Sequence, residues 1–401
     1  MGSLDDILNR VVSSRIFKCR NILRPDYVPD ELPHRETQIL RLGSILAPIL
    51  KGERPSNVLI YGLPGTGKTA VTKYVLRKFS EKAGTYNVPF TYAYINCRRI
   101  DTPYQVLAET AKSIGVKVPF TGLSTAEVYR RLVRGLESSE KTLLVVLDEI
   151  DYLIRKHGDD LLYRLVRINE ELNRSGVIII GITNDVKVTE PLDPRVKSSL
   201  SEEELVFPPY DALQLEDILE SRARDAFYDG VLEDGVIPLC SALAAREHGD
   251  ARRALDLLRV AGEIAEREGE SRVREYHVRI ARDELERDKV VELIKTMPLH
   301  GKLVVAALLK AERKHRIVTT GDVYKEYKSL CEALDIEVLT TRRISDIINE
   351  LNMLGILSAK VESRGRHGRT KIIRLIVPRS IVREALCDEP RLEKHIKSGA
   401  I

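Results

Sequence analysis

The chain of 401 residues is 43% hydrophobic and 31% charged, a composition that excludes a mainly disordered protein and is typical of two or three globular domains. Its longest apolar runs, such as residues 303–309 and 177–182, fall far short of the roughly 20 residues that cross a bilayer, which excludes a membrane protein. The net charge is only +4, but residues 300–386 contain 17 basic and 10 acidic side chains, and this local surplus predicts a nucleic-acid-binding surface.

A strand, a glycine-rich loop and a helix follow one another near the start of the chain. The apolar run 57–61 leads directly into the loop 62–69, and Val71, Val75 and Phe79 then recur at helical spacing. Further apolar runs alternate with helical patterns, which predicts parallel strands joined by helical crossovers in a three-layer α/β domain. The other predicted strands cover residues 90–96, 143–147 and 177–182, and the helices between them cover residues 103–114, 124–136 and 161–173.

The strand signals stop near Pro208, and two further patterns follow. Four amphipathic stretches predict a small all-helical domain. After residue 298, three helices precede two strands that are separated by a turn rich in arginine and glycine. We therefore expect three domains, at residues 1–207, 208–294 and 295–401. The helical stretches cover residues 213–227, 236–247, 250–266, 274–295, 303–314, 320–330 and 341–354, and the late strands cover residues 356–361 and 371–377.

The loop at residues 62–69 matches the phosphate-binding pattern G-x-x-x-x-G-K-[ST], in the strand-to-helix context that the pattern requires. Its glycines let backbone N–H groups converge on phosphates at a helix N-terminus, where the helix dipole favours negative charge. We expect Lys68 to reach the β- and γ-phosphates of ATP, and the Thr69 hydroxyl to bind Mg²⁺. The predicted contacts to ATP or ADP in this loop are Gly62, Pro64, Gly65, Thr66, Gly67, Lys68 and Thr69.

Polar residues at the ends of two later strands complete this predicted site. Asp148 and Glu149 follow the strand 143–147, where phosphate-loop proteins place a carboxylate that holds Mg²⁺, so we assign Asp148 to the metal. Glu149 is placed to orient or deprotonate the attacking water. Asn184 follows the strand 177–182, and it either contacts the γ-phosphate or the water, or is a turn residue without such a role.

The C-terminal segment predicts a winged helix, a variant of helix-turn-helix whose third helix enters the DNA major groove. Arg342 and Arg343 lie near the N-terminal end of that helix, where they would contact bases or phosphates. The turn after the first late strand combines glycines with basic side chains, which favours insertion into a minor groove. Alternatively, this turn is a solvated basic surface, or the winged helix binds protein. The predicted wing contacts are Arg364, Arg366, His367 and Arg369.

These motifs, in this order, resemble those of the AAA+ ATPases. The phosphate loop is similar to their Walker A motif, the stretch 147–151 to Walker B, and the strand that ends at Asn184 to sensor 1. The stretch 249–254 resembles the sensor 2 motif at the start of a lid helix, which implies that Arg252 contacts the γ-phosphate. The resemblance implies a P-loop domain with a parallel sheet, an all-helical lid and a C-terminal winged-helix domain.

Within the AAA+ proteins, the segment 17–36 and the stretch 192–199 resemble the archaeal origin recognition complex subunit one and cell division control protein six family. In that family the N-terminal segment wraps the adenine. The resemblance therefore implies nucleotide contacts from the segment and, at the lid boundary, from Tyr210. The implied residues of the segment are Tyr27, Val28, Pro29, Leu32, His34 and Arg35.

Two further features of the family are matched by only a few residues of this sequence. In eukaryotic members an arginine acts on the ATP of a neighbouring subunit, but Ser199 stands at that place here. Arg195 or Lys197 would substitute for it, or Arg195 only caps local structure. The family also has a second DNA contact in an inserted loop, which implies a role for Lys117 and Pro119.

The resemblance implies an initiator of DNA replication that binds double-stranded origin DNA and helps to recruit or load the replicative helicase, with paralogous initiator subunits as further partners. ATP would act as a switch, with slow hydrolysis. The acidic start at residues 1–6 lacks the pattern of a secretory signal, which predicts a cytoplasmic, nucleoid-associated protein. The alternatives are an ATP-switched transcription regulator, and an AAA+ factor that remodels proteins without sequence-specific DNA binding.

Overall fold

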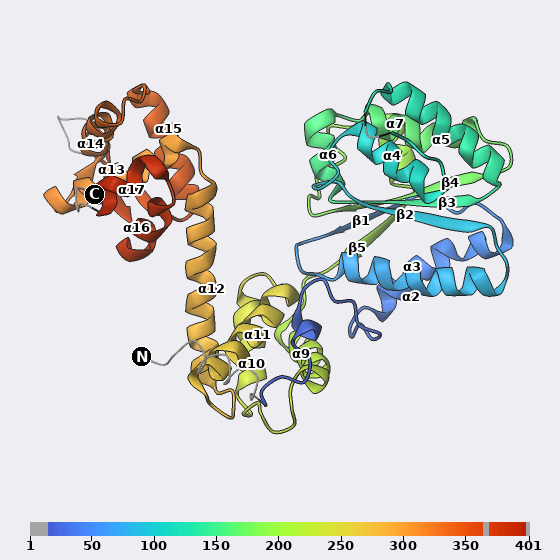
Figure 1. The fold of residues 1–401 in the computed structure, drawn as a ribbon, viewed down its shortest axis with the longest axis horizontal. Coiled ribbons are helices and arrows are strands. Elements are labelled where there is room, and N and C mark those ends of the chain that lie inside the picture. Colours follow the sequence, from blue (N-terminus) through green and yellow to red (C-terminus); the bar gives the residue numbers. More distant parts are fainter. Residues whose placement is uncertain (1–14, 120, 364–368, 398–401) are drawn as a thin grey trace. The chain divides into compact units, whose positions relative to one another are not determined.

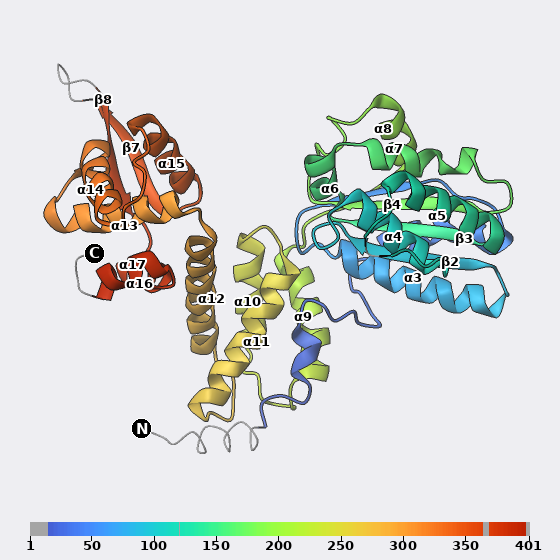
Figure 2. The ribbon, with the colours of Figure 1, turned by 45° about the horizontal axis from the view of Figure 1, so that its top comes forward.

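The structure is a computed structural model that describes residues 15–119, 121–363 and 369–397. The chain divides into two compact units, residues 1–279 and residues 280–401. Figures 1 and 2 show the helices and strands of each unit. In the part of the chain that the structure describes, no helix is long and apolar enough to cross a membrane.

A five-stranded parallel sheet in the order β2-β3-β4-β1-β5 forms the centre of the first unit and confirms the predicted α/β domain. Because β1 lies beside β4, the phosphate loop at the end of β1 is brought close to the polar residues that follow β3 and β4. The edge strand β5 was not predicted, because it is short and begins with two glutamates. The strands are β1 (Val58–Gly62), β2 (Phe90–Asn96), β3 (Thr142–Asp148), β4 (Gly176–Thr183) and β5 (Glu203–Phe207).

Helices cover both faces of this sheet, because successive side chains of a strand point to opposite faces. In β3, Leu143 and Val145 pack in the core beneath α4 to α7, whereas Leu144 and Val146 pack in the core with α2 and α3. The helices are α2 (Glu36–Leu46), α3 (Lys68–Thr85), α4 (Pro103–Ser113), α5 (Thr125–Ser139), α6 (Ile150–His157), α7 (Asp160–Arg167) and α8 (Pro194–Leu200), with short 3-10 helices η2 (Ala47–Lys51) and η3 (Ile168–Glu170).

The lid follows the sheet and is entirely helical. Asp211 begins α9 with a capping box, and Asp250 begins α11 by accepting hydrogen bonds from two backbone N–H groups of the first turn. The N-terminal helix η1 packs against α9 and α11, so the first described residues join the lid. The helices are η1 (Arg20–Leu23), α9 (Ala212–Ala226), α10 (Val236–Arg246), α11 (Ala251–Glu268) and α12 (Glu275–Thr296), the last of which passes residues 279 and 294 without a break.

The second unit contains the predicted winged helix. Three helices and an antiparallel sheet in the order β6-β8-β7 enclose an apolar core that includes Val305, Tyr327 and Ile348. The two-residue strand β6 and the last two helices were not predicted, since β6 is too short to show a period of two. The elements are α13 (Leu299–Lys314), β6 (Val318–Thr319), α14 (Thr320–Ala333), α15 (Thr341–Met353), β7 (Leu357–Ser363), β8 (Arg369–Leu375), α16 (Arg379–Cys387) and α17 (Pro390–Lys397).

Candidate nucleotide site and DNA interface

The phosphate loop lies directly against the first turn of the lid helix α11. The backbone N–H of Ala251 donates to the carbonyl oxygen of Gly65 over 3.2 Å. Gly65 has a left-handed φ of +72°, and a Cβ built on it would lie 1.7 Å from Oδ1 of Asp250. At Gly67, whose φ is +90°, a Cβ would lie 2.8 Å from the Tyr210 hydroxyl. Both positions therefore require glycine. The phosphate loop and the first turn of the lid helix are in direct contact and form one site.

The other predicted loop residues surround this contact in different ways. Pro64 is exposed, whereas Thr66 is buried and its hydroxyl donates to the carbonyl of Leu63 over 2.9 Å. The carbonyl of Gly62 accepts a hydrogen bond from Lys68. These contacts fix the loop in the curved shape that a phosphate-binding loop needs.

Lys68 is held in the centre of the loop. Its Nζ donates to the carbonyls of Gly62 and Leu63 over 2.7 Å and 2.8 Å, and to Oδ1 of Asn184 over 2.7 Å. Burial, and then the positive charge of Arg252, lower the pKa of Lys68 to about 8. The structure thus brings the predicted residues from the ends of β1 and β4 together.

Asp148 at the end of β3 accepts two hydrogen bonds on one oxygen. The Thr69 hydroxyl donates to Oδ2 over 3.0 Å, and the Tyr94 hydroxyl, from the neighbouring strand β2, donates to the same atom over 2.5 Å. Tyr94 was not predicted, because nothing local in its strand indicates a partner 54 residues away. Glu149 follows with a φ of +57°, a conformation that costs energy outside glycine and is common at functional sites.

A pocket beside the loop is lined on one side by the N-terminal segment. Four of the predicted segment residues line it, together with Tyr210 and the loop residues Gly65, Gly67 and Thr69. The lid supplies further lining side chains that were not predicted, because an apolar helical face looks the same whether it covers a core or a ligand. The four segment residues are Tyr27, Val28, Pro29 and Leu32, and the unpredicted lining residues from the lid include Ile218, Ser221, Arg222 and Leu255.

His34 and Arg35 do not line this pocket. Nε2 of His34 lies 2.7 Å from a carboxylate oxygen of Asp217 on α9. Arg35 is 2% exposed, and its guanidinium donates to the carbonyls of Thr66 over 2.9 Å and of Pro208 over 2.7 Å while stacking on the Tyr210 ring. Burial lowers the pKa of this guanidinium. Arg35 therefore connects the C-terminal end of the segment 17–36 to the phosphate loop without lining the pocket.

Two consecutive arginines at the start of α11 have different surroundings. Arg252 is exposed and lines the pocket, and its charge acts on Lys68. Arg253 instead forms an ion pair with Glu247 over 3.2 Å. Arg252 therefore lines the pocket, whereas its neighbour Arg253 is held in an ion pair.

Arg195 lies away from the pocket of its own chain. At the start of α8 its guanidinium pairs with both carboxylate oxygens of Asp193 over 3.1 Å, and the side chain is 67% exposed. The carbonyl of Ser199, further along the helix, accepts a hydrogen bond from Asn57 over 2.8 Å. Arg195 is accessible to a neighbouring molecule, but it must leave Asp193 to act there.

The start of α15 presents the two predicted arginines to solvent. The hydroxyl of Thr340 caps the helix, and Arg342 and Arg343 follow in its first turn. Lys371 of β8 donates to Ser345 over 3.2 Å and to Asn349 over 2.8 Å, which joins the wing strand to this helix. Of the predicted wing contacts, Arg369 begins β8, whereas Arg364, Arg366 and His367 lie outside the described residues.

The predicted second DNA contact lies in the loop after α4. Lys117 and Pro119 line a hollow with Arg99, Tyr104 and Lys112, and the Tyr104 hydroxyl donates to the carbonyl of Pro119 over 2.5 Å. Three basic side chains therefore gather around a loop whose shape is held by a tyrosine.

A phosphate loop at the carboxyl edge of a parallel sheet, a helical lid in contact with it, and a winged helix define an AAA+ protein. Three family models match: the AAA domain over residues 51–186, the Cdc6 AAA+ ATPase-type lid domain over 216–283, and the CDC6 C-terminal winged helix domain over 292–385. The AAA match supports nucleotide binding by this chain.

Comparisons over the whole chain identify the family within the AAA+ proteins. It is 56% identical to the ORC1-type DNA replication protein 1 of Sulfurisphaera tokodaii over 96% of either chain, and 56% identical to the ORC1-type DNA replication protein of Thermococcus onnurineus over 93% of this chain and 92% of that one. The solved Aeropyrum pernix ORC1 protein in complex with DNA matches with a TM-score of 0.84 and 54% identity, over 95% of this chain and 99% of that one. The chain belongs to the ORC1-type DNA replication protein family.

Proposed function

We propose that this chain is an ATP-dependent initiator of DNA replication that binds duplex DNA at origins. The observation that carries the proposal is a winged helix with exposed arginines at the start of α15, in a chain that is 54% identical to a protein solved in complex with DNA. The nucleotide pocket in the same chain supplies the control of that binding.

In this proposal ATP or ADP occupies the pocket between the phosphate loop and the N-terminal segment. Lys68 and the loop N–H groups hold the phosphates. Thr69 and Asp148 fit Mg²⁺, since the cation takes oxygen ligands and commonly binds through one or two carboxylates together with phosphates. Their oxygen atoms lie 3.0 Å apart, which supports this assignment. Mg²⁺, when bound, neutralises phosphate charge.

Slow hydrolysis would use the residues around the phosphates. Glu149 orients or deprotonates the water, and Asn184, which already contacts the phosphate-binding lysine, assists in placing it. Arg252 from the lid and Lys68 from the sheet domain bind the same phosphates, so the γ-phosphate favours one arrangement of the lid over another. ATP thereby acts as a switch.

The lowered pKa of Lys68 predicts that nucleotide affinity depends on pH. Its pKa of about 8 lies below the ordinary value of 10.5, because burial disfavours the charged ammonium group. Below pH 8 this group therefore lowers the stability of the folded chain, and the loss of stability disappears as the pH rises from 8 to 10.5. Phosphate binding needs the charged form. The ATP affinity should therefore fall by up to about tenfold per pH unit above pH 8. Calorimetry between pH 7 and pH 9.5 in two buffers would show proton uptake, and a flat affinity would contradict the prediction.

Further parts of the proposal concern partners. Lys117 and Pro119 form a second DNA contact, with the basic side chains around them. Arg195, once released from Asp193, acts on a nucleotide bound by a paralogous initiator subunit. The DNA-bound chain recruits or loads the replicative helicase, and it acts in the cytoplasm at the nucleoid.

Fluorescence anisotropy with ATP present tests the DNA-binding proposal. Duplexes tiled across the replication origin of the encoding genome should bind roughly a thousandfold more tightly than shuffled duplexes. Arg342→Ala should weaken binding and, if Arg342 contacts a phosphate, lower the slope of log affinity against log salt by about one. The matched control is Lys328→Ala, because the side chain of Lys328 on α14 is 57% exposed and forms an ordinary surface pair with Glu332 over 3.9 Å.

The other outcomes separate the remaining functions. Specific binding only at promoters remote from the origin would favour a transcription regulator. Equal binding to origin and shuffled duplexes, or no binding at moderate salt, would contradict the proposal and favour a factor that remodels proteins.

A further inference from the structure

The first described residues are attached to the lid. In this N-terminal strap, residues 16–24, the backbone N–H groups of Lys18 and Cys19 both donate to the carbonyl of Ala226, over 2.8 Å and 3.1 Å. The Phe17 ring packs against Phe227 with centroids 4.7 Å apart. It also lies so close to α11 that a Cβ at Gly262 would be 2.4 Å from it. The strap is therefore fitted to the surfaces of α9 and α11.

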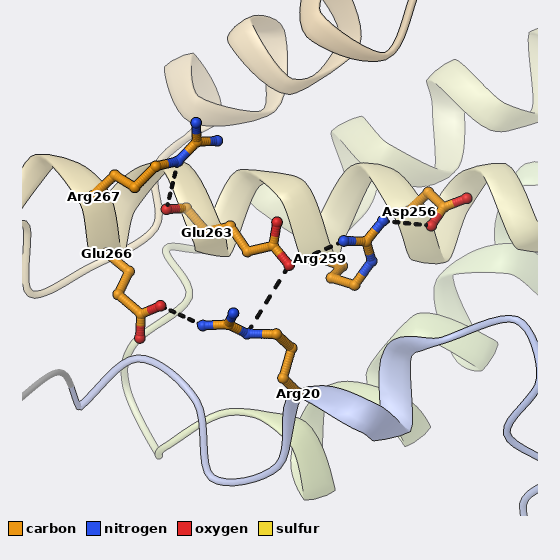
Figure 3. Close-up of polar contacts among 6 residues, drawn as sticks. All are labelled: Arg20, Asp256, Arg259, Glu263, Glu266 and Arg267. Carbon is orange, nitrogen blue, oxygen red and sulfur yellow. Dashed lines mark hydrogen bonds and ion pairs between the residues drawn. The ribbon is translucent and has the colours of Figure 1, made fainter. Parts of the chain in front are cut away.

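An ion-pair network anchors the strap to α11. Figure 3 shows Arg20 reaching from the strap to two carboxylates of this helix, Glu266 and Glu263. Glu266 is only 7% exposed. Glu263 also pairs with Arg259 over 2.9 Å, which holds its carboxylate in place. Because a buried carboxylate is costly without a partner, Arg20 is the cation that Glu266 needs.

A second arginine ties the strap to the pocket itself. Arg222 of α9 is 9% exposed, and it donates to the carbonyls of Ile22 over 3.1 Å and of Tyr27 over 3.3 Å. Its guanidinium also lies over the Tyr27 ring, 4.8 Å from the centroid. Tyr27 lines the nucleotide pocket. Arg222 therefore contacts both the strap and Tyr27, a residue of the pocket wall.

The far end of the same wall is fixed to the sheet domain. Arg35 donates to the carbonyl of Thr66 in the phosphate loop. Residues 25–33, all of which except Asp30 line the pocket, are therefore held by the lid at their beginning and by the phosphate loop at their end. A ligand that binds against residues 25–33 therefore contacts a segment whose position depends on both the lid and the phosphate loop.

We propose that Arg20 and Arg222 are positioning residues for the base of the nucleotide: they hold the wall at residues 25–33 against the base from the lid side. The inference rests on the proposed nucleotide function and deepens it. It adds a link between the base and the lid that does not depend on the γ-phosphate. ATP and ADP should therefore depend on Arg20 equally, whereas a ligand with phosphates but no base should not depend on it.

The test measures the affinities of the full chain for ATP, ADP and inorganic tripolyphosphate by isothermal titration calorimetry. Arg20→Ala should weaken ATP and ADP by the same factor, roughly fivefold to tenfold, because it removes a charge-assisted contact to a buried carboxylate. Tripolyphosphate affinity should change less than about twofold. Arg20→Lys keeps the charge and should recover part of the loss.

The matched control is Arg24→Ala, in the same strap. Arg24 is exposed, and within the described residues its side chain forms no ion pair or hydrogen bond. Its replacement should leave all three affinities unchanged. Glu266→Gln is a second test variant that avoids an unpaired buried charge, and it should show the same pattern as Arg20→Ala with a smaller loss.

Two results would overturn the inference. An equal loss for tripolyphosphate would show that Arg20 acts through the general stability of the phosphate site, and unchanged ATP and ADP affinities would show that the strap does not hold the wall. A wild-type chain that binds tripolyphosphate but neither ATP nor ADP would refute the base-binding pocket itself and with it the proposed function.

Discussion

Gly65→Ala is expected to lower ATP affinity by roughly a hundredfold, because a displaced loop loses hydrogen bonds from its N–H groups to the charged phosphates, and each such bond contributes about 1.5–3 kcal/mol. The new Cβ would stand 1.7 Å from Oδ1 of Asp250, so either the phosphate loop or the first turn of α11 must move. Asp250 cannot turn away freely, since its carboxylate caps α11 through the backbone N–H groups of Arg252 and Arg253. Equilibrium binding of ATP, together with a thermal unfolding curve, measures the effect.

Gly52→Ala is the matched control for this variant. Gly52 is exposed, has a left-handed φ of +75°, close to the +72° of Gly65, and a Cβ there would meet nothing within 4 Å. Alanine in this left-handed conformation costs about 1 kcal/mol, and only Gly65→Ala adds the clash with the lid. Similar ATP affinities for the two variants would mean that the contact between loop and lid has no role in binding.

Lys68→Ala is expected to lower ATP affinity by about a hundredfold to a thousandfold. The ammonium group is placed among three oxygen acceptors at the centre of the loop, and each hydrogen bond to a charged phosphate contributes about 1.5–3 kcal/mol. The loss should be similar for tripolyphosphate, because Lys68 contacts phosphates and not the base. Calorimetry with both ligands measures it.

Lys78→Ala on the same helix is the control for this second prediction. The side chain of Lys78 is 54% exposed and lies 3.7 Å from Glu81, as in an ordinary surface pair. It should bind ATP as the wild type does. If Lys68→Ala retained wild-type affinity, the assignment of the phosphate site would be wrong.

The sequence by itself determined the parts of this protein that depend on local backbone geometry. Glycines at fixed spacing between a strand and a helix can form only a small number of loops, so residues 62–69 identify a phosphate loop without knowledge of the rest of the chain. Periods of two and of about 3.6 residues likewise separated a parallel sheet, a helical lid and a winged helix. Asp148 was predicted as a metal ligand because carboxylates that bind a phosphate-bound metal follow a strand, and the structure places it in contact with the Thr69 hydroxyl.

Only the tertiary structure decided which distant residues meet at the site. Tyr94 donates to Asp148, Asp250 fills the space that Gly65 leaves open, and Arg20 pairs with Glu266 across 246 residues of sequence. His34 and Arg35 belong to a segment whose resemblance implied adenine contacts, but they lie outside the pocket lining.

The physical reason is the same in each case. A local pattern restricts φ and ψ and shows which face of an element is apolar, but it carries no information on which other element that face will contact. Arg20 and Arg24 look alike in the sequence, since both are arginines in one short segment. Packing of the strap on α11 places one of them beside a buried carboxylate and leaves the other in water.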